Sequence, residues 1–182
     1  MDNKGNGIRA LLFDLGDTIM IEETEVKDES GVTQSAEVFE GMVELLQYWA
    51  SRGVPIGLVA DSYVGTCRNV LSRHGVLELF DTLAISEDVG VEKPSPIIFE
   101  KALTDLNVAD DERSRVLMIG NNLSRDALGA NRLGLVSVRI QWNERYPKAP
   151  AAEMETPRYD VQNSADLQNL LQRLNNEYLA VK

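Results

Sequence analysis

Cysteine is almost absent from this chain of 182 residues, which contains only Cys67. A single cysteine excludes an intramolecular disulfide, and no neighbouring residue type indicates that Cys67 is a thiol nucleophile. Long apolar runs are also missing, so no segment of the sequence is long enough to cross a bilayer, and no signal peptide is recognisable. We therefore expect a cytoplasmic protein with no membrane partner.

Positive charge is scarce as well, because 18 lysines and arginines stand against 29 aspartates and glutamates, which gives a formal net charge of −11. A protein that holds nucleic acid by neutralising its phosphates needs a basic face, so the composition excludes that partner class. A phosphorylated small molecule would need a local cation in order to bind. The length and the 43% of hydrophobic residues suit one domain, residues 1–182, with a proper core.

Apolar runs alternate with helical patterns along most of the chain. Five apolar runs bounded by turn residues predict strands, at residues 10–14, 54–60, 82–86, 115–120 and 135–140. Helical spacing of apolar residues predicts helices at 36–52 with Ser35 as N-cap, at 65–74, at 97–106, after residues 121–126 as far as Leu133, and at 165–179. This alternation predicts an α/β fold with a mainly parallel central sheet and helices on both faces.

Two segments lack these patterns. Residues 21–35 are rich in Glu, Thr, Ser and Gly, which predicts an exposed loop or flap, or a small hairpin that turns near residues 28–31. Residues 141–160 contain three of the six prolines, and we expect an irregular segment there.

Polar side chains that can do chemistry follow several of the predicted strands. In parallel α/β sheets, ligands collect where the carboxyl ends of the strands meet. We therefore expect the following residues at one edge of the sheet: Asp14, Asp61, Ser62, Lys93, Asn121 and Asp126. A carboxylate at the tip of a buried strand, such as Asp14, could attack a phosphorus or carbon centre, hold a divalent metal, or simply cap a turn.

Four motifs, in this order, make the chain resemble the haloacid dehalogenase (HAD) superfamily, which consists mostly of Mg²⁺-dependent phosphatases. Residues 13–19, FDLGDTI, resemble its first motif, Asp-x-Asp-x-Thr. Residues 57–62 stand where the second motif belongs, residues 90–99 are very similar to the third, and residues 118–130 resemble the fourth, Gly-Asp-x(3 or 4)-Asp. The resemblance covers nearly the whole chain and implies a three-layer, Rossmann-like fold.

The resemblance also implies a role for each motif residue. Asp14 would be the nucleophile that forms an aspartyl-phosphate, and Lys93 would fix Asp14 and the phosphoryl oxygens. Asp61, Ser62 and Lys93 would bind the phosphate. The implied ligands of Mg²⁺ are Asp14, the backbone carbonyl of Gly16, Asn121 and Asp126. Together, Mg²⁺ and Lys93 would supply the positive field that an acidic protein needs in order to bind a phosphate.

Three positions depart from the family pattern. Gly16 stands where the phosphatases usually carry a second Asp, which protonates the leaving oxygen; a positioned general acid is worth roughly 10² to 10⁴ in rate. Asp17 is a neighbouring carboxylate, but adjacent side chains at a strand tip point in different directions, so it is the minor alternative. Ala60 lacks the hydroxyl of the second motif, which Ser62 could supply, and Asn121 removes one negative charge from the metal site.

These departures leave three hypotheses about function. The leading one is a Mg²⁺-dependent phosphomonoester hydrolase that acts on a phosphorylated small molecule or a larger phosphorylated substrate. The second is a degenerate relative that binds a ligand or partner without turnover. The third is a metal-free haloacid dehalogenase, which is disfavoured because too little chain separates the motifs to form the helical cap of those enzymes.

The absence of a large cap raises the question of what covers the site. Residues 21–35 or residues 142–147 could line the opening, and so could a second subunit. The helix at 165–179 could pack either on its own sheet or on another copy of the chain, so a homodimer is also an open alternative.

Overall fold

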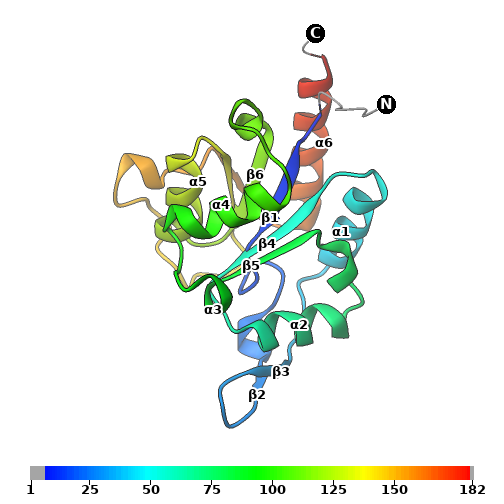
Figure 1. Cartoon of the computed structure of the whole chain (residues 1–182), viewed down its shortest axis with the longest axis vertical. Coiled ribbons are helices and arrows are strands. Elements are labelled where there is room, and N and C mark those ends of the chain that lie inside the picture. The colour runs from blue at the N-terminus through cyan, green and yellow to red at the C-terminus, as the bar shows by residue number, and fades with distance from the viewer. Residues whose placement is uncertain (1–6, 181–182) are drawn as a thin grey trace.

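A parallel sheet of six strands forms the centre of the computed structural model, which describes residues 7–180 (Figure 1). The strands are arranged in the order β5-β4-β1-β6-β7-β8, and each neighbouring pair is parallel. Their bounds are β1 Ala10–Phe13, β4 Ile56–Ala60, β5 Thr82–Ile85, β6 Val116–Gly120, β7 Val136–Ile140 and β8 Tyr159–Val161. The predicted α/β fold with a parallel central sheet is confirmed.

Strand β1 is apolar on both faces because it lies inside the sheet and inside the molecule. All four of its residues are fully buried. Leu11 pairs with Ile56 of β4 on one side and with Leu117 of β6 on the other. A continuous apolar run is typical of a parallel strand that is covered on both faces.

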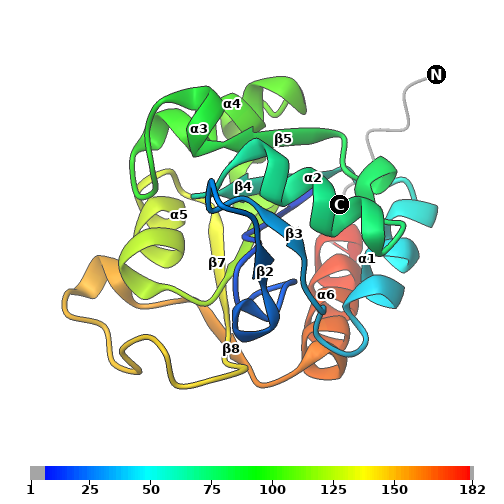
Figure 2. The same cartoon turned by 90° about the horizontal axis from the view of Figure 1, so that it is seen from below.

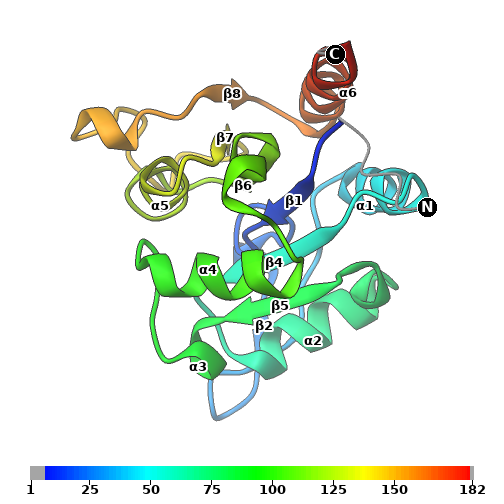
Figure 3. The same cartoon turned by 45° about the horizontal axis from the view of Figure 1, so that its top comes forward.

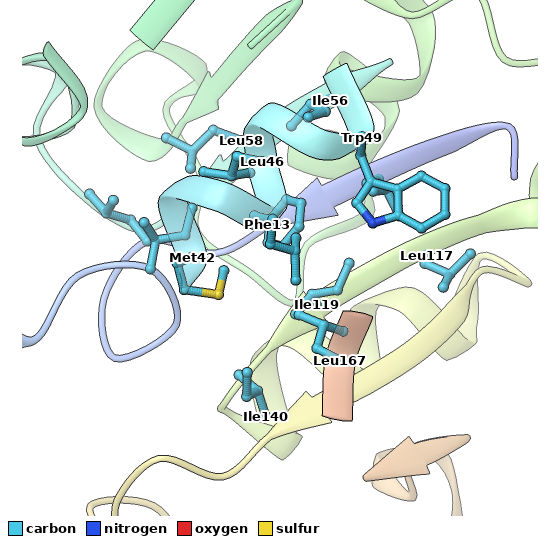
Figure 4. Close-up of a cluster of buried hydrophobic side chains, with 14 of the residues drawn as sticks. Phe13, Met42, Leu46, Trp49, Ile56, Leu58, Leu117, Ile119, Ile140 and Leu167 are labelled. Carbon is cyan, nitrogen blue, oxygen red and sulfur yellow. The ribbon is translucent and has the colours of Figure 1, made fainter. Parts of the chain in front are cut away.

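Helices cover the two faces of the sheet and create two hydrophobic clusters (Figure 3). The larger cluster contains residues from α1 (Met42–Ser51), α2 (Val64–Arg73) and α6 (Ser164–Ala180), as Figure 4 shows for α1 and the sheet. The smaller cluster contains residues from α4 (Pro96–Asp105) and α5 (Leu128–Arg132). The short elements are η1 Glu22–Thr24, η2 Leu77–Leu79, α3 Ser86–Val89, η3 Asp110–Arg115, η4 Leu123–Ala127 and η5 Glu153–Glu155.

Residues 21–35 form the second of the two predicted alternatives, a small hairpin. Strand β2 (Val26–Lys27) pairs antiparallel with β3 (Thr33–Ser35), and in the view of Figure 2 this hairpin lies in front of the sheet. Asp28 Oδ1 accepts hydrogen bonds from the backbone N–H groups of Ser30 and Val32, which stabilises the turn. The hairpin is attached to α2, because Thr66 Oγ1 accepts a hydrogen bond from the Thr33 N–H at 2.9 Å.

The helix predicted at residues 36–52 is shorter than expected, because α1 begins at Met42 and Ser35 belongs to β3. Gly41 has φ 80°, a left-handed conformation that cannot continue a helix. The apolar residues before it are buried in another way: Val38 forms an antiparallel bridge with Met20, and the Phe39 N–H donates to the Ile19 carbonyl at 2.9 Å. The spacing of these apolar residues resembles that of a helix, but they lie before the first residue of α1.

The prediction of an irregular segment at residues 141–160 is wrong at its end, because Tyr159 and Asp160 belong to β8. This strand is only three residues long and only Val161 is buried in it, so no apolar alternation marked it in the sequence. The helix that follows β6 also differs from the prediction, because its first turn, η4, is a wide π-helical turn that continues into α5. Among residues 7–180, no helix has the length and apolar character needed to cross a membrane.

Candidate active site

A pocket of about 230 Å³ lies at the carboxyl ends of the parallel strands. Its wall is built from the segments that follow β1, β4 and β6, from the loop that carries Lys93, from the β2–β3 hairpin, and from Tyr146. The structure brings all of the sequence-predicted site residues to this wall: Asp14, Gly16, Asp61, Ser62, Lys93, Asn121 and Asp126.

Lys93 is the buried cation at the centre of the site. Its Nζ donates hydrogen bonds to Asp14 Oδ1 and to Asp126 Oδ1, each at 2.7 Å, and the residue is only 4% exposed. Burial alone would lower the pKa of Lys93, but the carboxylates of Asp126, Asp14 and Asp61 outweigh burial and raise it. Lys93 is therefore a fixed positive charge at the tip of β1.

Asp14 follows β1 directly, and its backbone N–H donates to the Ile119 carbonyl of β6 at 2.9 Å. Burial raises the pKa of the Asp14 carboxyl from 3.8 to about 6; Lys93 lowers it and Asp126 raises it, and burial is the largest of these effects. Asp14 Oδ1 binds Lys93, whereas Thr18 Oγ1 lies 3.5 Å from Oδ2. Asp14 is thus an anchored carboxylate in the pocket wall, and it is ionised at neutral pH.

The carboxylate of Asp126 is also bound by the backbone of the turn that contains Asp126. Its Oδ2 accepts a hydrogen bond from the Asn122 N–H at 3.0 Å. The carboxylate lies so close to the backbone of Gly120 that a side chain at that position would overlap it, which explains the glycine at the end of β6. Both oxygens of Asp126 are therefore engaged, one with the backbone and one with Lys93.

Asp61 connects the backbone of Lys93 with the side chain of Arg125. Its Oδ1 accepts a hydrogen bond from the Lys93 N–H at 2.8 Å, and its Oδ2 accepts one from Arg125 Nη1 at 2.8 Å. Arg125, which also lies 3.5 Å from Glu92, lines the pocket, although the sequence patterns did not single it out. Its partial burial alone would lower the pKa of Arg125, but Asp61 and Glu92 outweigh this effect and raise it.

Gly16 is covered by the side chain of Glu22, a second residue that the sequence analysis did not single out. A Cβ atom at Gly16 would overlap Glu22 Oε1, which lies directly over this backbone position. Asp17, by contrast, is 1% exposed and does not line the pocket. Its Oδ1 accepts a hydrogen bond from the Glu22 N–H at 3.0 Å, so Asp17 supports the turn that carries Glu22.

Residues 142–147 form a strap beside the site. Trp142 stacks on Phe39 with ring centroids 4.3 Å apart and donates its indole N–H to the Thr18 carbonyl at 2.9 Å. Arg145 forms ion pairs with Glu22 and with Asp17 Oδ2, and Tyr146 lines the pocket. The strap therefore reaches the opening of the pocket, and its arginine binds protein carboxylates.

The residues available to hold a metal ion are two carboxylates, one amide and one backbone carbonyl. Among residues 7–180, no group of three or more His, Cys, Asp or Glu side chains has the arrangement of a metal site. The buried Nδ2 of Asn121 has no hydrogen-bond partner among the described residues; this NH2 group is a donor, so Asn121 would bind a metal ion through its Oδ1 atom. A donor set of oxygen atoms fits Mg²⁺, which binds proteins through one or two carboxylates and keeps other positions for water and phosphate.

Cys67 takes no part in this chemistry. It lies in α2 and is fully buried, and burial raises the pKa of its thiol to about 12. A thiol with so high a pKa carries almost no thiolate at neutral pH. The prediction that Cys67 is not a nucleophile agrees with its environment.

Comparison with known proteins gives one consistent family. A family model described as haloacid dehalogenase-like hydrolase matches residues 7–134, which is more than half of the chain. Over 136 residues the chain is 29% identical to a glyceraldehyde 3-phosphate phosphatase from Methanopyrus kandleri, and this match covers 75% of the chain and 57% of the relative. Over 148 residues it is 34% identical to the pyrimidine 5′-nucleotidase YjjG from Escherichia coli, covering 79% of the chain and 62% of the relative.

The fold is shared with solved structures at lower sequence identity. A HAD phosphatase from Thermococcus onnurineus superimposes with a TM-score of 0.73 at 20% identity, over 92% of this chain and 99% of that one. A dehalogenase also reaches 0.73 at 15% identity, over 90% and 97% of the two chains, so the fold alone does not separate the two chemistries. The chain spans about three fifths of the length of the first curated relatives that it matches. From the matched residues 7–134 and the shared fold, we conclude that this chain belongs to the haloacid dehalogenase-like hydrolases.

Proposed function

We propose that this protein is a phosphomonoester hydrolase in which Asp14 is the nucleophile. The observation that carries the proposal is the position of Lys93 Nζ, which lies 2.7 Å from the carboxylates of both Asp14 and Asp126 at the floor of the pocket. Phosphoryl transfer needs an aligned nucleophile and neutralisation of the phosphoryl charge. Asp14 would be the nucleophile that Lys93 aligns, and Lys93 together with the proposed Mg²⁺ would neutralise the charge. Relatives named as phosphatases support this choice over dehalogenation.

In the proposed reaction, Asp14 attacks the phosphorus atom and the bond from phosphorus to the leaving oxygen breaks. The aspartyl-phosphate that results is then hydrolysed by water, which releases phosphate and restores the carboxylate. Lys93 binds Asp14 through Oδ1, so the other carboxylate oxygen is the one available for attack. With its pKa at about 6, Asp14 is in the ionised form required of a nucleophile at neutral pH.

The phosphate would be bound by groups on the tips of β1, β4 and β6. We propose Ser62 and the Lys93 ammonium as direct contacts, with Arg125 as an additional cation at the opening of the pocket. The carboxylate of Asp61 is committed to the Lys93 N–H and to Arg125, so Asp61 would contact a phosphate only through its backbone N–H. This assignment keeps negative charge away from the substrate dianion.

We propose Mg²⁺ as the cofactor, held by Asp14, the Gly16 carbonyl, Asn121 and Asp126. When it is bound, Mg²⁺ supplies a positive charge that offsets the charge of the phosphoryl group. Since only two of these ligands are carboxylates, we expect weaker binding of Mg²⁺ than at a site with three. Asn121 would bind Mg²⁺ through its side-chain oxygen, because its NH2 group is a hydrogen-bond donor.

The proposed substrate is a phosphorylated small molecule. The pocket has a volume of about 230 Å³, and the hairpin and Tyr146 form part of its wall. A larger phosphorylated substrate is the alternative, because the hairpin and the strap leave the pocket without a separate cap domain within residues 7–180. A role in binding without turnover is the second candidate function, and it is favoured by Gly16, Ala60 and Asn121 at family motif positions.

The test is hydrolysis of p-nitrophenyl phosphate, with Mg²⁺ and with EDTA, by the wild-type protein and by Asp14→Asn. We expect turnover that requires Mg²⁺ and falls to background in the variant. Asp111→Asn is the matched control, because Asp111 is an exposed aspartate in η3, which directly precedes β6 and so lies at the end of that strand away from the pocket. If the wild-type protein is no faster than Asp14→Asn, the phosphatase proposal is wrong and binding without turnover replaces it.

A further inference from the structure

The carboxylate of Glu22 occupies the space that a side chain at residue 16 would enter. A Cβ at Gly16 would overlap Glu22 Oε1 and would lie 3.0 Å from its Cδ. Both residues line the pocket that contains Asp14. The position from which a phosphatase of this family would extend its second aspartate is therefore filled, in this chain, by a carboxylate from another part of the sequence.

Glu22 is held in place at both ends. Its backbone N–H donates to Asp17 Oδ1 at 3.0 Å, which fixes the start of η1. Its Oε2 forms an ion pair with Arg145 of the strap. Oε2 is the oxygen closest to Arg145, and Oε1 is the oxygen that lies over Gly16. The ion pair thus holds the Glu22 carboxylate with Oε1 directed toward the position of the missing side chain.

We propose that Glu22 is the general acid and base of the reaction and replaces the aspartate that Gly16 lacks. This inference rests on the phosphatase function proposed above. In the first step, Asp14 forms a bond to phosphorus while the bond to the leaving oxygen breaks, and the protonated Glu22 donates its proton to that oxygen, which leaves as an alcohol. In the second step, water attacks the phosphorus of the aspartyl-phosphate, and the Glu22 carboxylate takes the proton of that water as Asp14 leaves.

Asp17 does not fit this role, although it is nearer to Asp14 in the sequence. Its φ of 47° turns the residue away from the pocket, where it is 1% exposed. Its Oδ1 is bonded to the Glu22 N–H, and its Oδ2 lies 3.3 Å from Arg145 Nε. Asp17 is a positioning residue, and Glu22 is the carboxylate of this turn that lines the pocket with Asp14.

The experiment compares leaving groups in wild type, Glu22→Gln and Glu23→Gln. The substrates are 2,4-dinitrophenyl phosphate, whose leaving group needs no proton, and a panel of alkyl phosphates: glycerol phosphate, glucose 6-phosphate and a nucleoside 5′-monophosphate. We expect Glu22→Gln to lower kcat/KM for the alkyl phosphates by about 10²- to 10⁴-fold and to change it by less than about tenfold for the dinitrophenyl ester. Glu23, which is exposed and lies outside the pocket, is the matched control and should change neither value.

A second pair of variants moves the carboxylate to the family position. Gly16→Asp alone should be impaired, since its Cβ overlaps Glu22. In Glu22→Ala/Gly16→Asp the overlap is removed, and we expect kcat/KM for alkyl phosphates to recover by at least about tenfold over Glu22→Ala. Recovery of this kind depends on the proton donor and would not follow from stability alone.

The outcomes separate the two proposals. If the wild-type protein cleaves alkyl phosphates and Glu22→Gln slows both substrate types equally, or slows neither, the role of Glu22 is refuted and the phosphatase function stands. Cleavage of the dinitrophenyl ester alone by the wild type also refutes the role of Glu22, since no general acid would then be acting. If the wild-type protein cleaves none of the substrates, the phosphatase function itself is wrong.

Discussion

At the scale of single residues, the site depends on one buried lysine between carboxylates. Removing one partner of a buried ion pair leaves an uncompensated charge, which lowers the free energy of unfolding. Replacing a carboxylate that is costly to ionise in the folded protein raises it. Asp14 is both a partner of Lys93 and a carboxylate that is costly to ionise, because folding raises its pKa from 3.8 to about 6 even with Lys93 beside it. The nucleophile is therefore held in the protein at the expense of stability.

The pH dependence of unfolding tests this conclusion. Because its pKa is raised on folding, Asp14 contributes stability below pH 4, and this contribution is lost as the pH rises through 6. A shift of about two pKa units corresponds to about 3 kcal/mol. Relative to the wild-type protein, Asp14→Asn should therefore become more stable by up to about 3 kcal/mol between pH 4 and pH 7.

The measurement is urea denaturation of both proteins in EDTA, at several values of pH across this range, with Asp111→Asn as the control. The free energy of unfolding of the control should follow that of the wild-type protein. A stability difference between Asp14→Asn and wild type that stays constant with pH would show that burial does not disfavour the Asp14 carboxylate.

At the scale of elements, the strap of residues 142–147 lies along one side of the site and is attached there by the side chain of Trp142. Trp142 stacks on Phe39 and donates a hydrogen bond to the Thr18 carbonyl, four residues after Asp14. Trp142→Phe keeps an aromatic ring and loses the hydrogen bond, so we expect it to lower the free energy of unfolding by about 1 kcal/mol. Trp142→Ala also loses the stacked ring, and we expect about 2 to 3 kcal/mol.

Urea denaturation followed by the fluorescence of Trp49, the other tryptophan, measures these differences. Hydrogen exchange of residues 142–147 should become faster in Trp142→Ala than in Trp142→Phe, since the strap loses its attachment. Equal stability of Trp142→Ala and the wild-type protein would show that the strap does not depend on this contact.

The elements also show what the sequence could and could not predict. The tips of β1, β4 and β6 were predictable, because short apolar runs that are bounded by turn residues and end in polar residues are typical of buried parallel strands. Strand β8 was not, because only Val161 of its three residues is buried. Gly41 decides where α1 begins, and its left-handed φ is a property of the folded chain that apolar spacing does not reveal.

The same limit applies to the site. The site residues at the family motif positions were predictable as a group, because these motifs stand after the predicted strands. Glu22 and Arg125 reach the pocket from a 3₁₀ turn and a π-helical turn, and neither turn has a sequence period. The one local signal was Gly16, the departure from the family pattern that removes the second aspartate.

At the scale of the whole molecule, β1 joins the two hydrophobic clusters. Leu11 and Phe13 point into the larger cluster, and Ala10 and Leu12 belong to the smaller one. Both clusters therefore depend on the same strand, and loss of either one would expose one face of β1. We therefore expect the chain to unfold as a single cooperative unit, in line with the predicted single domain.

Thermal or urea unfolding followed by tryptophan fluorescence and by far-ultraviolet circular dichroism tests this prediction. Both tryptophans, Trp49 and Trp142, report on the larger cluster, while circular dichroism reports on the helices of both clusters. Coincident transitions are expected, and two separate midpoints would show that the clusters unfold independently. A midpoint that rises with protein concentration would support the homodimer that the sequence left open.

The strand order has a consequence for the nascent chain. Strand β1 is the first to emerge from the ribosome, yet one of its two neighbours, β6, is separated from it by β4, β5 and the helices between them. Until Val116–Gly120 has been synthesised, the backbone of Ala10–Phe13 has an unpaired edge, which is a template for pairing with other chains. The strand that precedes the nucleophile thus has only one of its two neighbours until residue 120 has been made, and a ribosome that stalls before β6 would release an aggregation-prone fragment.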